Sequence, residues 1–268
     1  MPDLRIQTNI DNGDLPEQLE LFEEQEPKKM SLFDISILCP TKYRPEGLEK
    51  MWESAINTAD SPDSLELVVY VEHYDTETLN KLEELEQKYG SQILKIIGQE
   101  EVIYSSLHNI CCENSSADLF FCAADDLVFR SQGWDSSAKE VFQEYNDNIV
   151  YAYPNDGHWG SELGTHGVFH KNWYNTLGYI APAIFTVDYS DNYIMDVSRA
   201  IGRAIYIPHI LVEHMHWTFG KSEFDKTAQE AHSRRASTNN GGIYQSYETK
   251  QIQNQDIEKL KTFIELNR

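Results

Sequence analysis

The chain has 268 residues, which suits one large α/β domain with appendages and allows a substantial buried core. It carries 22 Lys and Arg against 44 Asp and Glu, so the formal net charge is −22 and a polyanion is repelled, which argues against tight, sequence-independent DNA binding. No stretch is long enough to cross a bilayer and no signal peptide opens the chain, so we expect a soluble, cytoplasmic protein with no membrane attachment.

Residues 1–32 form the first segment, and they are acidic. Eight acidic residues stand against three basic ones in residues 1–30, with little apolar periodicity. This composition predicts a disordered leader, because such a segment buries too little apolar surface to offset its ordering entropy. One stretch does not fit that description. In "LPEQLELFEE" (15–24), three large apolar residues, Leu19, Leu21 and Phe22, fall within four positions.

From Phe33 onward, strand-like and helix-like segments alternate. The expected strands are 33–39 ("FDISILC"), 65–72 ("LELVVYVE"), 93–97 and 118–124 ("DLFFCAA"), and the expected helices are 46–59, 76–89 and 105–114. Strands rich in Val, Ile and Phe that are separated by helices predict βαβ units and a mostly parallel sheet. Loop chemistry is then expected at the carboxyl ends of the strands.

After about Ile149 the pattern becomes irregular, with many aromatic residues, glycines and histidines. We expect a helix at 190–201, strands near 204–207 and 211–215, and a terminal helix at 254–266. Four cysteines occur in or beside the apolar runs and form no CxxC pair: Cys39, Cys111, Cys112 and Cys122. They are typical of reduced, buried cysteines rather than of a disulfide framework or a zinc site.

Acids and histidines at strand ends are the first candidates for chemistry. Asp125 and Asp126 follow a buried strand directly, and two adjacent carboxylates repel each other unless a cation or hydrogen-bond donors compensate. Oxygen ligands of this kind suit Mg²⁺ or Mn²⁺, and we favour a metal site over a turn that caps the strand. In "VEHMHW" (212–217), His214 and His216 alternate on an expected strand and face one side, where either is a further candidate ligand. One core and one surface histidine would explain that pattern equally well.

Two further candidates lie where a helix begins. Asp191 stands near the start of the expected helix 190–201, where an acid either compensates the helix dipole or serves as a general base aimed into a cleft. Thr41, Lys42 and Arg44 precede the helix at 46–59, and backbone N–H groups with two cations there suit a diphosphate or nucleotide. Neither G-x-x-x-x-G-K-[ST] nor G-x-G-x-x-G occurs, so a P-loop NTPase and an NAD-binding Rossmann domain are unlikely.

These residues, in their order along the chain, resemble family-2-like glycosyltransferases of the GT-A fold. "PTKYRPEGLEKMWESA" (40–55) resembles the opening P-T-x-N-R-P segment, and "LHNICCENSSADLFFCAADD" (107–126) resembles the R-N segment that ends in the acidic metal-binding motif. "DLVFRSQGWD" (126–135), "SDNYIMDVSRAIGR" (190–203) and "VEHMHW" resemble the G-W stretch, the segment of the catalytic base and the closing histidine. The match covers about residues 33–220. It departs at Ala124, where the first acid of a D-x-D motif is missing, and at His108, where the family usually has Arg.

The resemblance implies an α/β GT-A fold, with a mostly parallel central sheet flanked by helices and a C-terminal helix. It divides the core, 33–220, into a nucleotide-sugar half (33–126) and an acceptor half (127–220), followed by a helical extension (221–268). It implies an inverting, metal-dependent transfer in which Asp126 with His214 or His216 holds Mn²⁺ or Mg²⁺ and Asp191 is the base. The donor is expected to be a UDP-sugar, and the residues expected to bind it are Pro40, Thr41, Lys42, Arg44, Glu72, His108, Asn109, Asp125 and Lys221. The loop "NDGHWGSELGTHG" (155–167) is either an acceptor-side loop or a structural one.

The leader resembles a docking peptide. Gln18, Leu19, Leu21 and Phe22 match the Q-L-x-L-F motif by which bacterial replication proteins bind the DNA sliding clamp. A disordered segment of this kind buries its apolar side chains in a preformed groove. The acceptor is then expected to be DNA, and the whole resembles bacteriophage enzymes that glycosylate 5-hydroxymethylated pyrimidines. Arg234 and Arg235, in a Ser/Asn/Gly-rich stretch expected to be a solvated loop, are candidate phosphate contacts.

Two other functions remain open. A glycosyltransferase for a surface or capsular glycan fits the core equally well but leaves QLELF unexplained. A non-catalytic clamp-binding or nucleotide-binding protein on the same scaffold fits Ala124 and His108.

Overall fold

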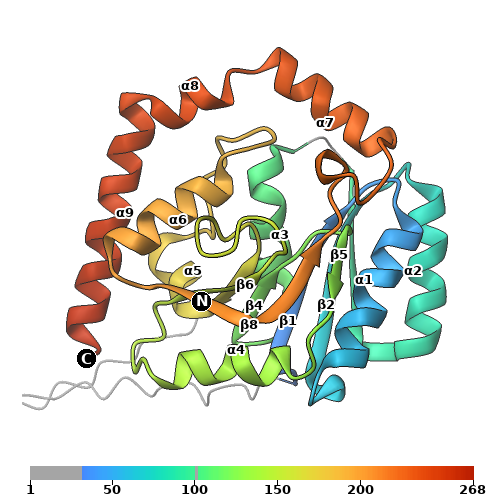
Figure 1. The fold of residues 1–268 in the computed structure, drawn as a ribbon, viewed down its shortest axis with the longest axis horizontal. Coiled ribbons are helices and arrows are strands. Elements are labelled where there is room, and N and C mark those ends of the chain that lie inside the picture. Colours follow the sequence, from blue (N-terminus) through green and yellow to red (C-terminus); the bar gives the residue numbers. More distant parts are fainter. Residues whose placement is uncertain (1–31, 100–101) are drawn as a thin grey trace, which may run out of the picture. The chain divides into compact units, whose positions relative to one another are not determined.

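Eight strands form one mixed sheet in the computed structural model, which describes residues 32–99 and 102–268 (Figure 1). Their order across the sheet is β3-β2-β1-β4-β7-β6-β8-β5. The strands are β1 (Ile35–Thr41), β2 (Leu65–Glu72), β3 (Ile93–Gly98), β4 (Leu119–Cys122), β5 (Leu127–Phe129), β6 (Tyr151–Asn155), β7 (Gly167–His170) and β8 (Ala204–His214).

The first half of the sheet is parallel, as the alternation of strands and helices predicts. β1 pairs in parallel with β2 and β4, and β2 pairs in parallel with β3. The crossovers are α1 (Pro45–Thr58), α2 (Thr76–Tyr89) and α3 (Leu107–Asn114). The carboxyl ends of β1 and β4 therefore meet at one edge of the sheet.

The second half is mixed, which the sequence did not indicate. β7 is antiparallel to both β4 and β6, whereas β6 and β8 are parallel. The helices here are α4 (Trp134–Gln143), α5 (Lys171–Leu177) and α6 (Ser190–Ala200). The prediction of two strands at 204–207 and 211–215 is wrong, since β8 is continuous. Its register against β6 shifts around Pro208, which has no N–H group to donate to the ladder.

The sheet is buried on both faces, because alternate residues of each strand point to opposite sides. On β1, Ile35, Ile37 and Cys39 belong to a core shared with α1, α2 and α4, while Leu38 belongs to a core shared with α3, α5 and α6. In Figure 1, α1 and α2 lie on the opposite side of the sheet from α5 and α6. All four cysteines are free and buried, which confirms that prediction.

Three C-terminal helices follow the sheet and run along the top and left of the view in Figure 1. They are α7 (Lys226–Ser237), α8 (Asn240–Gln245) and α9 (Tyr247–Leu266). The terminal helix begins before the expected residue 254, because Ser246 caps it by accepting a hydrogen bond from the Thr249 backbone N–H. Its buried Asp256 accepts hydrogen bonds from Tyr179 and Tyr193, which fixes α9 to the rest of the fold. No helix among the described residues is both long and apolar enough to traverse a membrane.

Candidate functional site

A cavity of about 1060 Å³ lies where β1, β4 and β8 end. Most of the residues expected from the sequence line it, although they come from distant parts of the chain. Those are Pro40, Thr41, Lys42, Arg44, Glu72, His108, Asp125, Asp126, Asp191, His214 and His216. The docking residues Gln18, Leu19, Leu21 and Phe22, with the rest of 1–31, lie outside the described residues.

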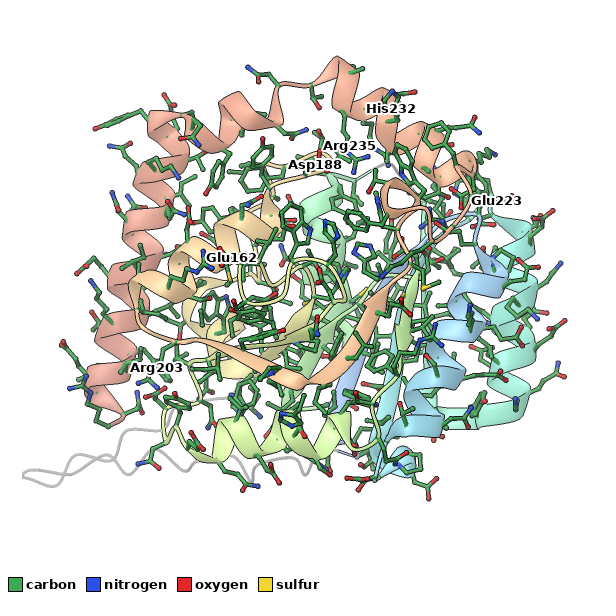
Figure 2. The ribbon with its side chains drawn as sticks, viewed as in Figure 1. Glu162, Asp188, Arg203, Glu223, His232 and Arg235 are labelled. Atoms are coloured by element: carbon green, nitrogen blue, oxygen red, sulfur yellow. The ribbon has the colours of Figure 1, made fainter. Side chains whose placement is uncertain are left out.

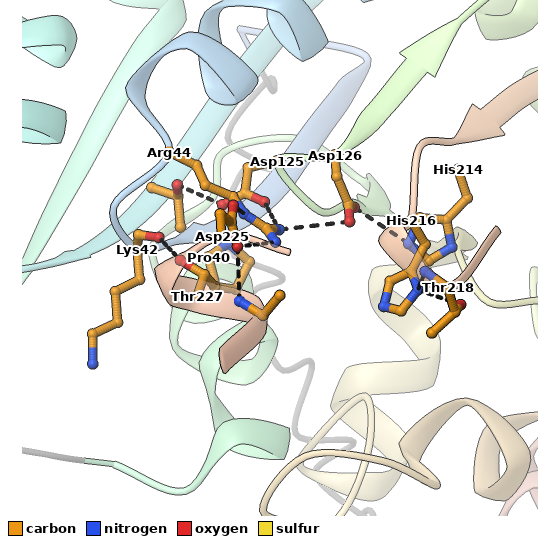
Figure 3. Close-up of polar contacts among 12 residues, drawn as sticks. Pro40, Lys42, Arg44, Asp125, Asp126, His214, His216, Thr218, Asp225 and Thr227 are labelled. Atoms are coloured by element: carbon orange, nitrogen blue, oxygen red, sulfur yellow. Dashed lines mark hydrogen bonds and ion pairs between the residues drawn. The ribbon is translucent and has the colours of Figure 1, made fainter. Parts of the chain in front are cut away.

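Arg44 joins the β1 end of the cavity to the acids after β4 (Figure 3). Its Nη1 lies 2.9 Å from Asp125 Oδ1 and 3.5 Å from Asp126 Oδ2, and its Nε donates to Asp225 Oδ2 at 2.7 Å. Thr41 Oγ1 donates to the other oxygen of Asp125 at 2.8 Å. Burial, against the opposing charge of Arg44, raises the pKa of Asp125 to about 6. Thr41 and Arg44 thus occupy both side-chain oxygens of Asp125 as hydrogen-bond acceptors.

Gly47 allows α1 to approach this acidic pair. A Cβ atom at residue 47 would lie 2.6 Å from the Asp125 carbonyl oxygen. The glycine thus lets the first turn of α1, and with it Arg44, pack against the loop after β4.

Asp126 and His214 are close but not hydrogen-bonded. Asp126 Oδ1 lies 3.3 Å from His214 Nε2, and both Asp126 Oδ1 and His214 Nδ1 are buried without a hydrogen-bond partner among the described residues. Burial raises the pKa of Asp126, but His214 and Arg44 outweigh it and hold that pKa below its usual value, so the carboxylate is charged.

The distance between Asp126 Oδ1 and His214 Nε2 is compatible with both atoms binding one metal ion. Two ligand atoms with bonds of about 2.1 Å to one metal are roughly 3.0–3.4 Å apart at octahedral or tetrahedral angles, which matches their separation. No group of three or more His, Cys, Asp or Glu side chains in the described chain is arranged to hold a metal by itself. Asp126 and His214 therefore suit a metal whose remaining ligands would come from outside the described chain.

Two more histidines adjoin His214. The ring centroids of His166 and His216 lie 4.8 Å and 5.2 Å from that of His214. Burial and the neighbouring His214 lower the pKa of His216 and hold that of His166 well below its usual value, so both are neutral, as metal-binding imidazoles are. His216 is not on β8, contrary to the sequence prediction. It caps the short helical turn Trp217–Phe219 and accepts from Thr218.

Asp191 enters the same cavity from the first turn of α6. Its Oδ1 accepts a hydrogen bond from the backbone N–H of Asn192 at 2.9 Å. Burial raises the pKa of Asp191, and the nearby Asp188 contributes to the same shift. A carboxylate with a raised pKa is a stronger base than a free aspartate.

Several solved structures have a similar fold, although no protein-family model and no curated protein matches the sequence. The mannosyltransferase PcManGT from Pyrobaculum calidifontis, in complex with GDP-Man and Mn²⁺, superposes with a TM-score of 0.55 at 15% identity, over 72% of this chain and 61% of that one. GalNAc-T7 with UDP, GalNAc and Mn²⁺ gives 0.58 at 12%, over 70% and 44%. S. aureus TarS 1–349 gives 0.53 at 11%, over 68% and 60%.

The chain has a GT-A-like fold. At these identities the likeness concerns the fold alone, and the chain spans between 44% and 61% of the length of those three proteins. The α/β class, the mostly parallel half-sheet and the long C-terminal helix predicted from the sequence are confirmed.

At the β1 end of the cavity, two residues that the sequence predicted to bind the donor already have partners within the protein. Lys42 Nζ lies 2.8 Å from Glu230 of α7, and His108 Nε2 lies 2.9 Å from the Ala123 carbonyl oxygen. Two others do not line the cavity. Asn109 is buried and bonds to the backbone of Ile180 and Ala181, and Lys221 pairs with Glu213 at 3.1 Å.

On the other side, the loop 156–166 is organised by the buried carboxylate of Asp156. One of its oxygens accepts from the backbone N–H groups of His158 and Trp159, and the other accepts from Thr165 Oγ1. Trp159, Thr165 and His166 line the cavity, and Trp159 is 46% exposed. The loop is thus fixed by internal contacts and also contributes to the site. Its Gly- and His-rich composition was noticed in the sequence, but nothing there singled out His166.

The helix α7 lies within the helical extension expected at 221–268, but the stretch around Arg234 and Arg235 was expected to be a solvated loop, whereas both arginines lie on α7. Asp225 caps α7 by accepting from the Ala228 N–H. The residues that face the cavity from it are Thr227, Ala228, Ala231, Arg234 and Arg235. Their spacing of three and four residues is the available signal, but the small and basic residues in the segment made it weak.

Proposed function

We propose that this protein is a metal-dependent, inverting glycosyltransferase that moves a sugar from a nucleotide sugar, a UDP-sugar first of all, to a hydroxyl acceptor. The observation that carries the proposal is the pair Asp126 and His214, whose side chains approach within 3.3 Å in the cavity of a GT-A-like fold, while one buried side-chain atom of each has no hydrogen-bond partner among the described residues. Asp191 in the same cavity supplies a base.

The roles follow from the chemistry of the side chains. Asp126 and His214, with His216 as a further candidate, hold Mn²⁺ or Mg²⁺. When bound, the metal supplies positive charge that favours departure of the nucleoside diphosphate. Asp191 accepts the proton of the acceptor hydroxyl, whose oxygen forms the new bond to the anomeric carbon as the bond to the diphosphate breaks. The donor side consists of Pro40, Thr41, Lys42, Arg44, Glu72, His108 and Asp125. Asn109 and Lys221, which the sequence also assigned to the donor, do not line the cavity and are left out of this donor side.

For the acceptor we propose a 5-hydroxymethylated pyrimidine in phage DNA, with recruitment by the DNA sliding clamp. Support comes from the sequence alone, through the match of Gln18, Leu19, Leu21 and Phe22 to Q-L-x-L-F. A clamp tether supplies the effective concentration on DNA that an acidic surface does not. A surface or capsular glycan is the alternative acceptor. Ala124, in place of the first acid of a D-x-D motif, favours the second alternative, a non-catalytic nucleotide-binding scaffold.

The test is a transfer assay with Mn²⁺, a panel of UDP- and GDP-sugars, and DNA containing hydroxymethylcytosine or hydroxymethyluracil, followed by mass spectrometry of the digested nucleosides. Asp126→Asn and Asp191→Asn should each lower transfer by about 10²–10⁴-fold. Transfer that survives both substitutions would contradict the assigned site. Transfer to a free glycan with none to modified DNA would establish the first alternative. Removal of residues 15–24 should abolish clamp binding without lowering turnover on short oligonucleotides.

A further inference from the structure

The cationic side chains of the cavity differ in whether they are neutralised. In the described chain, those that line it are Lys42, Arg44, Arg234 and Arg235. Three of them face carboxylates. The partners are Glu230 for Lys42, Asp125 and Asp225 for Arg44, and Asp188 for Arg235. Figure 2 shows Asp188 and Arg235 next to each other, and the Nε and Nη2 atoms of Arg235 donate hydrogen bonds to the Asp188 carboxylate.

Arg234 is the exception. No carboxylate of residues 32–99 or 102–268 lies within ion-pair distance of its guanidinium, and its Nε is buried with no hydrogen-bond partner there. A buried donor without a partner destabilises the protein that contains it, so a ligand that accepts its hydrogen bond is favoured.

The surroundings of Arg234 leave room for such a ligand. Ala228 and Ala231 precede it on α7 by six and three residues, and both line the cavity. Their small side chains leave the volume beside the guanidinium open. His216, which stands next to the proposed metal ligand His214, lines the same cavity.

We propose that Arg234 is a donor-binding residue whose guanidinium hydrogen-bonds the diphosphate of the nucleotide sugar. This rests on the proposed function, because the diphosphate is the anion that such a donor brings to the cavity. Arginine presents a planar fork of donors that matches phosphate oxygens, and the bond is stronger because both groups are charged. Lys42, Arg44 and Arg235 already have carboxylate partners, so among the described residues Arg234 is the cation available to the phosphate without breaking an ion pair.

A structural role would explain the position of Arg234 differently. Arg234 and Arg235 both lie in the last turn of α7, where a cation compensates the negative end of the helix dipole. That role predicts a change in stability without a change in ligand affinity. Arg235 is the matched control, since it lies on the same turn and in the same cavity but is paired with Asp188.

The experiment is calorimetric titration of the full-length protein, with and without Mn²⁺, using UDP, GDP, uridine, guanosine and inorganic pyrophosphate as probes. The proteins are the wild type, Arg234→Gln, Arg234→Lys and Arg235→Gln, and the thermal midpoint of each is measured without ligand. Arg234→Gln should lower the affinity for pyrophosphate, and for whichever nucleoside diphosphate the wild type binds, by about 10- to 100-fold. The same substitution should change the affinity for the corresponding nucleoside by no more than about twofold, because the nucleoside has no phosphate for Arg234 to bind. Arg234→Lys should fall between, and Arg235→Gln should change the diphosphate affinity by less than about threefold.

The outcomes separate the two proposals. If the wild type binds neither UDP nor GDP, the proposed function fails and this inference fails with it. If the wild type binds UDP or GDP and Arg234→Gln binds it equally well, only the assignment of Arg234 is overturned. An equal loss for the nucleoside and the diphosphate, or a fall in the thermal midpoint with unchanged affinity, would also overturn it in favour of a structural role.

Discussion

The two sides of the cavity differ in how completely their polar groups are paired. On the side of β1, Thr41 and Arg44 occupy both oxygens of Asp125. On the side of β8, Asp126 and His214 approach within 3.3 Å, yet one buried atom of each has no hydrogen-bond partner in the described chain. Of these two adjacent aspartates, Asp125 accepts hydrogen bonds on both side-chain oxygens, whereas Asp126 Oδ1 accepts none from the described residues.

This difference indicates which polar groups support the fold and which await a ligand. A buried network in which each group has a partner stabilises the structure without any ligand. A buried group without a partner is retained at a cost in stability, which is common where a protein binds or reacts. The β1 side is therefore expected to respond to substitution through folding, and the β8 side through binding.

The largest expected effect separates Asp125 from Asp126. Asp125→Ala leaves Arg44 with fewer charged partners and Thr41 with no acceptor, so we expect a loss of about 3 kcal/mol in the free energy of unfolding. Asp126→Asn keeps the shape and leaves Arg44 its pairs with Asp125 and Asp225, but it removes a negative charge that His214 and Arg44 stabilise, so we expect a smaller loss of about 1–2 kcal/mol. Urea unfolding with and without Mn²⁺ measures both.

The same unfolding curves test the ligand side of the comparison. Mn²⁺ should stabilise the wild type by mass action and should not stabilise Asp126→Asn. Equal destabilisation by the two substitutions, or Mn²⁺ stabilisation that persists in Asp126→Asn, would show that the two sides do not differ in this way.

The next effect concerns Asp156, which positions the loop carrying Trp159 and His166. Asp156→Ala leaves two backbone N–H groups and the Thr165 hydroxyl without their acceptor, so we expect a loss of about 2 kcal/mol. Because that loop also lines the cavity, transfer should fall while Mn²⁺ binding through Asp126 and His214 persists. Thr165→Val removes one of these hydrogen bonds and should cost about 1 kcal/mol. Unchanged stability in Asp156→Ala would mean that the loop does not depend on this carboxylate.

Strands whose own residues favour a buried strand were predicted from the sequence. The strand at 65–72 is rich in Leu and Val and was predicted with the bounds it has as β2. The positions at strand ends made Asp126, His214 and His216 candidates, and the resemblance to GT-A glycosyltransferases then predicted that Asp126 and one of the two histidines share a site. The short strands β6 and β7 were not predicted, because their pairing is set by contacts with β4 and β8 rather than by their own residues.

The parts of the site that could not be predicted depend on how loops and C-terminal helices return to the sheet. His166 reaches His214 at the end of a loop whose course Asp156 determines. Arg234 reaches the cavity because Asp225 both caps α7 and pairs with Arg44, a contact between residues far apart in sequence. Lys221 was predicted to bind the donor because a cation can offset phosphate charge, but the sequence does not fix the direction of a side chain, and this one pairs with Glu213.

A pH effect of intermediate size is expected from Asp191, whose pKa burial raises above the usual 3.8. Because the folded state holds this proton more tightly than the unfolded state, the stability contributed by the group is present at low pH. It is lost as the pH rises through the folded-state pKa. Asn does not titrate, so the stability of the wild type relative to Asp191→Asn should fall as the pH rises above 3.8. Urea unfolding of both proteins across this range measures the difference, and a difference that does not change with pH would contradict the shift.

The smallest effect is expected at Lys221, which pairs with Glu213 on the outside of β8. Arg130 also pairs with Glu213, at 2.9 Å, so the carboxylate keeps a partner when the lysine is removed. Lys221→Ala should therefore change the free energy of unfolding by no more than about 0.5 kcal/mol. It should leave the affinity for UDP or GDP unchanged, since Lys221 does not line the cavity.

Lys42→Ala is the matched comparison for Lys221→Ala, because Lys42 lines the cavity and holds Glu230 of α7 at 2.8 Å. Removing it should lower nucleotide affinity more than removing Lys221 does, in calorimetric titrations at one ionic strength. If Lys221→Ala has the larger effect, the donor phosphates lie nearer to β8 than the cavity indicates. The sequence assignment of Lys221 as a donor contact would then be right and the division of the cavity into a paired β1 side and an open β8 side would be wrong.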